Sequence, residues 1–246
     1  MQKKESRISL EDTVIMKTKL IIIFSIIQFT AFGQVSFDNI DTSLVKKWNP
    51  KLEIEYQAVY HFGDSEWESK LILISGLDKW YAQIESGSWS GSGNELTWVY
   101  SYENLTNVRV VGNKFYSDKT NGEFVYFEGT NGRIKGLKVY DSWSGEDEFE
   151  IGHKLNSLQT IYSGRFPQAS MRLLSTDELQ KMSKKDLKIM RNEIFARYGY
   201  MFKTGGEMDL YFQQQDWYKK QHDSVNQFFT DLEKENIILI REVESR

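Results

Sequence analysis

The chain has 246 residues, 40% of them hydrophobic and 14% aromatic, with a formal net charge of −4 and no cysteine. This apolar content is sufficient to bury one or two cores, and the lack of cysteine excludes a disulfide framework and a cysteine-linked lipid anchor. The mildly acidic charge argues against nucleic acid as a partner.

A targeting signal is predicted at the N-terminus. Lys17 and Lys19 precede an apolar run at 20–29, and small residues follow as far as Gly33. This pattern is typical of a secretory signal peptide, and the run is too short to span a membrane. We therefore expect a natural start at Met16, with 1–33 as upstream extension plus signal peptide. Cleavage near Gly33 would release a soluble periplasmic or extracellular protein without a membrane span.

Residues 34–167 are predicted to form an antiparallel β-domain. Apolar and polar residues alternate there in short runs that are rich in β-branched and aromatic side chains. The runs cover 52–60, 67–74, 80–84, 96–102, 108–111, 124–127 and 134–140. Asn121-Gly122 and Asn131-Gly132 are typical of tight hairpins. We expect a meander closed into a barrel or a sandwich, because an open sheet would leave exposed edges.

Residues 168–246 are predicted to form a small all-helical domain after a short linker at 168–172. Ser175 and Thr230 each stand three residues before a glutamate, which predicts a capping box and a helix start at each. The expected fold class is therefore α+β, with an antiparallel barrel or sandwich followed by helices.

The stretch from Ser183 to Gly199 is the most specific in the sequence. Ser183 offers an N-cap, Gly199 offers a left-handed C-cap, and the apolar residues between them are spaced for one buried helix face. Residues 191–199 closely resemble the signature of the YARHG domain, a small extracellular bacterial module. The string is Arg191, Asn192, Glu193, Ile194, Phe195, Ala196, Arg197, Tyr198 and Gly199.

The resemblance continues through 200–203, 211–212 and 216–218 into the terminal helix. Phe195 stands where the family usually has Tyr, and Tyr198 stands where it usually has His. A family role that needs the imidazole therefore cannot be transferred. The family brings no established chemistry, so the resemblance implies a module and leaves its ligand open.

The polar residues of this helix are expected to be structural. Glu193 and Arg197 are four apart and can pair along the helix. Arg191 or Asn192 can hold the terminal helix or the following loop at 202–206. The aromatic residues of the module are expected to form its core.

Trp89 and Trp143 are the candidate ligand-binding residues. Each lies in a Ser-Trp-Ser-Gly string, at 88–91 and 142–145. Small neighbours leave an indole exposed as a platform for a sugar ring or another chain. The alternative is that both rings fold back over the end of the β core.

The sequence shows no catalytic constellation, and we expect no enzyme, no cofactor and no metal site. His61, His153 and His222 lack metal-ligand spacing, and the acidic residues at 146–150 are typical of a solvated hairpin tip. We expect an exported, noncatalytic binding or envelope-associated protein, with an envelope glycan or another envelope protein as its partner. One alternative is a carrier that encloses a small apolar ligand in the β-domain. Another is a hydrolase of envelope glycan, which would need a cleft that gathers His153 with two carboxylates.

Overall fold

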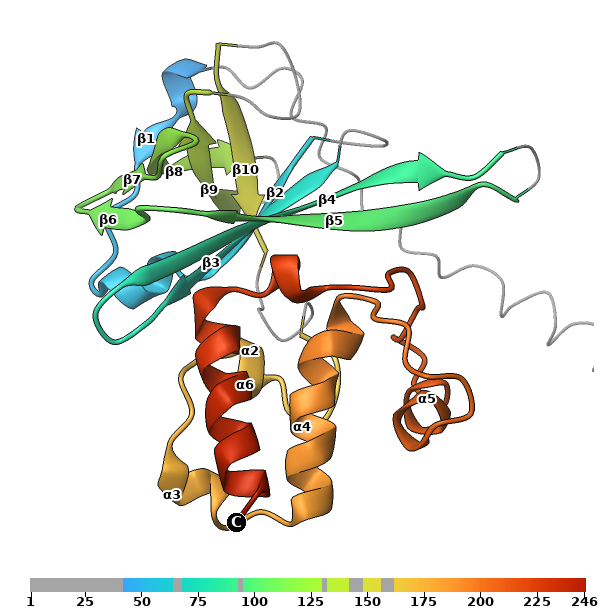
Figure 1. The fold of residues 1–246 in the computed structure, drawn as a ribbon. Helices are drawn as coiled ribbons and strands as arrows, with labels where there is room; N and C mark the ends of the chain where they lie inside the picture. Colours follow the sequence, from blue (N-terminus) through green and yellow to red (C-terminus); the bar gives the residue numbers. More distant parts are fainter. Residues whose placement is uncertain (1–41, 64–67, 93–94, 130–131, 142–147, 156–161) are drawn as a thin grey trace, which may run out of the picture. The chain divides into compact units, whose positions relative to one another are not determined.

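The computed structural model describes residues 42–63, 68–92, 95–129, 132–141, 148–155 and 162–246. These residues lie in one compact unit, Phe37–Arg246, in which a curved sheet adjoins a layer of helices (Figure 1). The α+β class predicted from the sequence is confirmed. The predicted signal peptide lies outside the described residues. No helix in the described part of the chain is long and apolar enough to cross a membrane.

The sheet is an antiparallel half-barrel. Its strands are β1 (Lys46–Lys47), β2 (Ala58–Phe62), β3 (Ser69–Ser75), β4 (Trp80–Ser90), β5 (Thr97–Leu105), β6 (Arg109–Val111), β7 (Lys114–Tyr116), β8 (Asn121–Gly129), β9 (Gly132–Val139) and β10 (Glu150–Lys154). They follow the order β5-β4-β3-β2-β10-β9-β8-β7-β6, and β1 pairs with β8. Two meanders therefore meet where β2 pairs with β10. β5 and β6 are the two ends of this order, so the sheet stays open instead of closing into a barrel.

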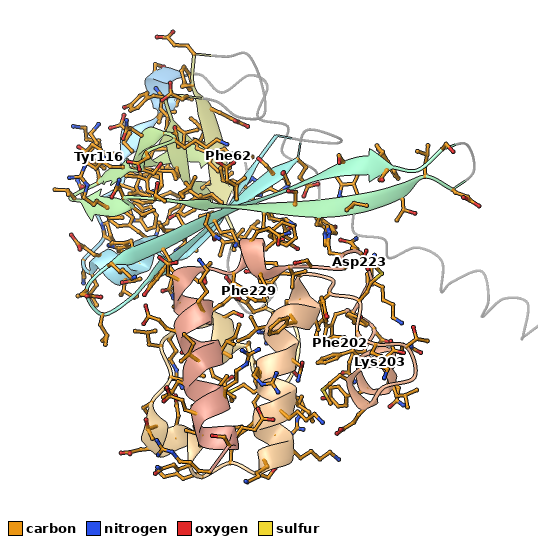
Figure 2. All side chains as sticks on the ribbon, viewed as in Figure 1. Phe62, Tyr116, Phe202, Lys203, Asp223 and Phe229 are labelled. Atoms are coloured by element: carbon orange, nitrogen blue, oxygen red, sulfur yellow. The ribbon has the colours of Figure 1, made fainter. Side chains whose placement is uncertain are left out.

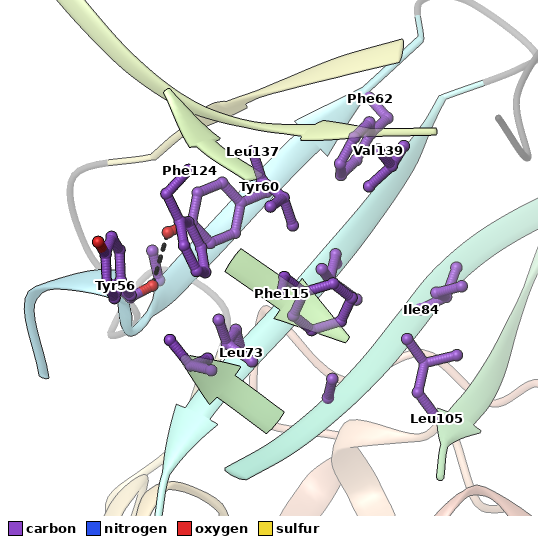
Figure 3. Close-up of a cluster of buried hydrophobic side chains, with 14 of the residues drawn as sticks. Tyr56, Tyr60, Phe62, Leu73, Ile84, Leu105, Phe115, Phe124, Leu137 and Val139 are labelled. Atoms are coloured by element: carbon purple, nitrogen blue, oxygen red, sulfur yellow. Dashed lines mark hydrogen bonds between the residues drawn. The ribbon is translucent and has the colours of Figure 1, made fainter. Parts of the chain in front are cut away.

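Aromatic and aliphatic side chains fill the concave side of the sheet (Figure 3). The largest fully buried members are Tyr56, Tyr60, Phe62, Phe115, Phe124, Leu71, Leu73 and Leu137. Tyr56 and Phe124 stack with ring centroids 3.9 Å apart. The Tyr60 hydroxyl donates to the Tyr56 carbonyl at 2.6 Å. The described side chains on this side of the sheet thus form a packed hydrophobic core.

Two sequence predictions for the β region are wrong in detail. The predicted strand at 52–60 begins instead with a 3-10 helix, η2 (Glu53–Tyr56), and only its last three residues, 58–60, belong to β2. The backbone amides of Lys51 and Leu52 donate to the Glu55 carboxylate, which stabilises this turn. Asn121 and Gly122 pair with β7 inside strand β8 and form no turn. β8 and β9 pair as a hairpin with Gly132 opposite Gly129, but Asn131 of the predicted Asn131-Gly132 turn lies outside the described residues.

The helices are α2 (Gln168–Met171), α3 (Thr176–Leu179), α4 (Lys184–Arg197), α5 (Glu207–Phe212) and α6 (Asp231–Glu244), with a 3-10 turn η6 (Asn226–Phe228) before α6. The predicted caps at Ser175, Ser183 and Thr230 are confirmed. Helix α2 occupies the segment for which a linker was predicted, because Asn236 on α6 binds the carbonyls of Ala169 and Arg172.

The aromatic residues of the helical part form a core, as predicted. Two clusters contain them, one around α4 and α6 with Phe229, the other between α4 and α5 with Phe202. Figure 2 shows both of these residues within the helical layer.

Candidate functional site

Strands β4 and β5 continue together beyond the rest of the sheet (Figure 1). β3 pairs with β4 as far as Glu85, whereas β5 pairs with β4 as far as Ser90. In this extension Trp89 lies opposite Trp98, and Gly87 lies opposite Tyr100. Because residues two apart on a strand point to the same face, these residues share one face of the hairpin.

A surface hollow of about 350 Å³ lies on this face, and we call it the hairpin cleft. Its volume is at the lower end of the range of about 300–1,000 Å³ that is usual for small-molecule sites. Its lining residues are Glu68, Ser69, Lys70, Glu85, Ser86, Gly87, Trp89, Trp98 and Tyr100.

Two tryptophans form a corner in the hairpin cleft. The ring centroids of Trp89 and Trp98 are 5.2 Å apart and their planes meet at 78°. Trp89 is 54% exposed. Trp98 lies against Gly87 so closely that a Cβ atom at position 87 would collide with the indole. The missing side chain at Gly87 therefore creates the room that lets Trp98 form a wall of the cleft.

Charged groups line the remainder of the hairpin cleft. The Lys70 ammonium contacts the Glu85 carboxylate at 2.8 Å, and His61 Nε2 lies 2.7 Å from Glu68 Oε1. Burial disfavours the charged form of Lys70, but the Glu85 carboxylate outweighs this effect and raises the pKa of Lys70. Each carboxylate of the cleft is thus engaged by a basic side chain.

His61 and His153 lie side by side on the paired strands β2 and β10, with ring centroids 4.8 Å apart. Burial, together with the nearby His61, lowers the pKa of His153 to about 4. His153 is therefore neutral at neutral pH. Its position beside His61 follows from strand pairing between distant parts of the chain, which the sequence alone does not reveal.

A buried polar network surrounds helix α4. The Arg197 guanidinium donates to the carbonyls of Ser163 and Phe166 and to the carboxylate of Glu193. Glu193 also accepts from the backbone amides of Arg165 and Phe166, each at 2.8 Å. Burial raises the pKa of Glu193 in spite of these bonds. Arg197 and Glu193 thus fix the segment at 163–166 to the helix.

The sequence of this helical region matches a known protein family. The model of the YARHG domain matches residues 164–245. These residues form a YARHG domain. No curated protein and no solved structure matches the chain significantly.

The characteristic residues of the YARHG domain are mainly structural in this chain. Arg191 pairs with Glu244 at the end of α6, as predicted for the terminal helix. Asn192 donates to the Lys188 carbonyl within its own helix. The Tyr198 hydroxyl, at the usual histidine position of the family, donates to the buried Glu233 at 2.7 Å.

The YARHG domain docks on the sheet next to the hairpin cleft. Gln83 on β4 and Asn104 on β5 donate to the Phe228 carbonyl, at 2.6 and 3.2 Å. The Tyr198 hydroxyl lies 3.2 Å from Gln83 Oε1. The domain therefore holds the base of the hairpin whose outer part carries the cleft.

The YARHG domain also binds the edge of β5 directly. The side-chain amide of Gln221 accepts from the Tyr100 amide at 3.2 Å and donates to the Trp98 carbonyl at 3.1 Å. His222 Nε2 lies 2.9 Å from the Tyr100 carbonyl. Gln221 thus takes the place of a neighbouring strand and fixes the backbone of two residues that line the cleft.

Gly199, the last residue of the characteristic string, positions Gln221. It adopts the predicted left-handed conformation, with φ at +72°, and its carbonyl accepts from the amides of Gln221 and His222 at 2.8 and 3.0 Å. A Cβ atom at Gly199 would lie 2.9 Å from the Lys219 carbonyl. The family string is thereby connected to the hairpin cleft through two successive contacts, from Gly199 to Gln221 and from Gln221 to the backbone of β5.

The structure places one of the two predicted ligand-binding residues in this cleft. Trp89 lines it, whereas Trp143 lies outside the described residues. Sequence reasoning missed Trp98 and Tyr100. The available signal was the alternation of Trp98, Tyr100 and Tyr102, but this pattern predicts a buried strand face equally well.

Proposed function

We propose that this chain is an exported, noncatalytic binding protein that takes a sugar ring of a cell-envelope glycan in the hairpin cleft. The observation that carries the proposal is the Trp89–Trp98 corner, which lines the same cleft as the Lys70–Glu85 pair. An indole face packs well against the C–H face of a sugar, and charged groups can bind its hydroxyls. Export is supported by the YARHG domain, which occurs in exported proteins.

Calorimetric titration with soluble peptidoglycan fragments tests this proposal. Trp89→Ala and Trp98→Ala should each weaken binding by about tenfold, because each removes one stacking face. Tyr116→Ala removes a half-buried aromatic ring on β7, which is not part of the cleft, and should leave the affinity unchanged. The proposal would be contradicted if the native chain did not bind, or if Trp89→Ala and Trp98→Ala bound the glycan as tightly as the Tyr116→Ala control.

A hydrolase is the second candidate, because Glu68 and Glu85 line one cleft and His61 contacts Glu68 beside His153. A glycosidase needs one protonated and one ionised carboxyl group. Glu85, however, is paired with Lys70, and Glu68 is in contact with His61. Both carboxylates already have a basic partner, which supports binding over hydrolysis. We expect no new reducing ends after incubation with the glycan. Product formation that disappears in Glu85→Gln would establish the hydrolase instead.

A further inference from the structure

A second hollow, of about 490 Å³, lies at one end of the half-barrel core. We call it the basic cleft, and its lining residues are Lys47, Trp48, Asn49, Pro50, Lys51, Glu55, Tyr126, Arg133 and Lys135. The lining thus holds four cationic side chains and one carboxylate in a chain whose net charge is −4.

The strand pattern explains why the charges gather there. Arg133 and Lys135 alternate along β9 with the same spacing as Leu137 and Val139, so they belong to the same face of the strand. Leu137 and Val139 are buried in the core. Lys154 on β10 lies opposite Tyr60, another core residue. The core-facing row of β9 therefore changes from apolar to cationic at this end of the half-barrel, and Lys154 on β10 adds a further cation there.

Trp48 belongs both to the core and to the lining of the basic cleft. The ammonium groups of Lys135 and Lys154 lie 4.4 and 5.2 Å from the centre of its ring. Burial and the nearby charge of Lys135 lower the pKa of Lys154. The two ammonium groups repel each other, and an anion between them would relieve this repulsion.

The carboxylates of the described residues leave much of this charge uncompensated. Glu55 is occupied by the backbone amides of Lys51 and Leu52, and Arg133 pairs with the exposed Glu128. In the described part of the chain, no carboxylate lies within ion-pair distance of Lys47, Lys51 or Lys135. A preformed concave site with excess positive charge selects multivalent anions.

We propose that the basic cleft binds a ligand that carries two or more phosphate groups. The planar guanidinium of Arg133 matches the geometry of phosphate oxygens, and the lysines supply point charges around it. A free diphosphate and the headgroup of cardiolipin, which carries two phosphates, share this chemistry. The site is separate from the hairpin cleft and does not depend on the function proposed for that cleft.

Calorimetric titration with inorganic pyrophosphate, in parallel with flotation on vesicles that contain cardiolipin, tests the proposal. Pyrophosphate should bind, and its affinity should fall as the salt concentration rises. Lys135→Gln and Lys51→Gln should each weaken binding by about fivefold. Lys119→Gln should have no effect, because Lys119 pairs with Glu103 elsewhere on the sheet.

Lys51 is exposed, so its substitution does not endanger folding. Vesicle binding without pyrophosphate binding, lost in the same two variants, would identify the lipid headgroup as the source of the phosphate. No binding to either probe, or equal binding by Lys51→Gln and the native chain, would overturn the proposal.

Discussion

The Glu193–Arg197 pair shows how burial changes the meaning of a sequence pattern. Four-residue spacing predicts an ion pair on a helix, which stabilises an exposed helix by only a few tenths of a kcal/mol. Here the two side chains are only 1% and 6% exposed, and Arg197 also binds Ser163, Phe166 and Ser170. Removing one partner would leave the other charge buried, so the pair is much more important for folding than its spacing indicates.

Arg197→Met should lower the free energy of unfolding by about 3–5 kcal/mol, because Glu193 would lose its cation inside the protein. Arg191→Met on the same helix is the matched control. The ion pair of Arg191 with Glu244 is partly exposed, and its loss should cost only about 1 kcal/mol. Denaturant titration measures both values. Equal losses would show that the buried network is not a major source of stability.

Asp209 should make the fold sensitive to acid. Hydrogen bonds from Lys220, the Gly205 amide and Gln213 lower its pKa to about 2. Because the folded-state pKa is below the ordinary value of 3.8, the stabilisation is fully present above about pH 4 and is lost as the pH falls towards 2.

Asp209→Asn should therefore be less stable than the native chain at pH 6 but lose less stability between pH 4 and pH 2. Denaturant titration across this range measures the difference. Asp216→Asn, at an exposed position in the same domain, serves as the control. A native-like acid dependence in Asp209→Asn would refute this role.

At the scale of elements, local patterns predicted most of the strands and the helix N-caps at Ser175, Ser183 and Thr230. The 3-10 helix at Glu53–Tyr56 was missed because its stability depends on one side-chain contact by Glu55. The open half-barrel could not be predicted, since strand order depends on non-local pairing. The hairpin cleft was missed for the same reason, because it needs Gly87 and Trp98 to meet on neighbouring strands.

The contact between Gln221 and strand β5 can be tested on its own. Gln221→Ala removes the acceptor of the Tyr100 amide, so that amide should exchange with deuterium about fivefold faster. Glycan affinity should fall as well, because the backbone of Trp98 and Tyr100 would no longer be held by Gln221. Gln227→Ala, which affects only a local bond to the Ser224 carbonyl, is the control. An unchanged exchange rate of the Tyr100 amide would argue against this role of Gln221.

At the scale of the whole molecule, the sheet and the YARHG domain share a core. Val59, Ile72 and Ile74 on the convex side of the sheet pack with Tyr162 and with Leu232 of α6. The β region and the helices are therefore expected to unfold in one transition.

Deletion of residues 164–245 should expose this apolar face and cause aggregation. Size-exclusion chromatography, with the full-length chain in parallel, checks this expectation. A monodisperse truncated chain would show that the β region folds independently of the YARHG domain.

The central claim is that the hairpin cleft, fixed by the YARHG domain, binds a glycan ring. A nuclear magnetic resonance titration of the tryptophan indole N–H signals with soluble peptidoglycan fragments tests it most directly. We predict that the signals of Trp89 and Trp98 shift and that the signal of Trp48, beside the basic cleft, does not. A saturating titration that leaves Trp89 and Trp98 unchanged would contradict the account.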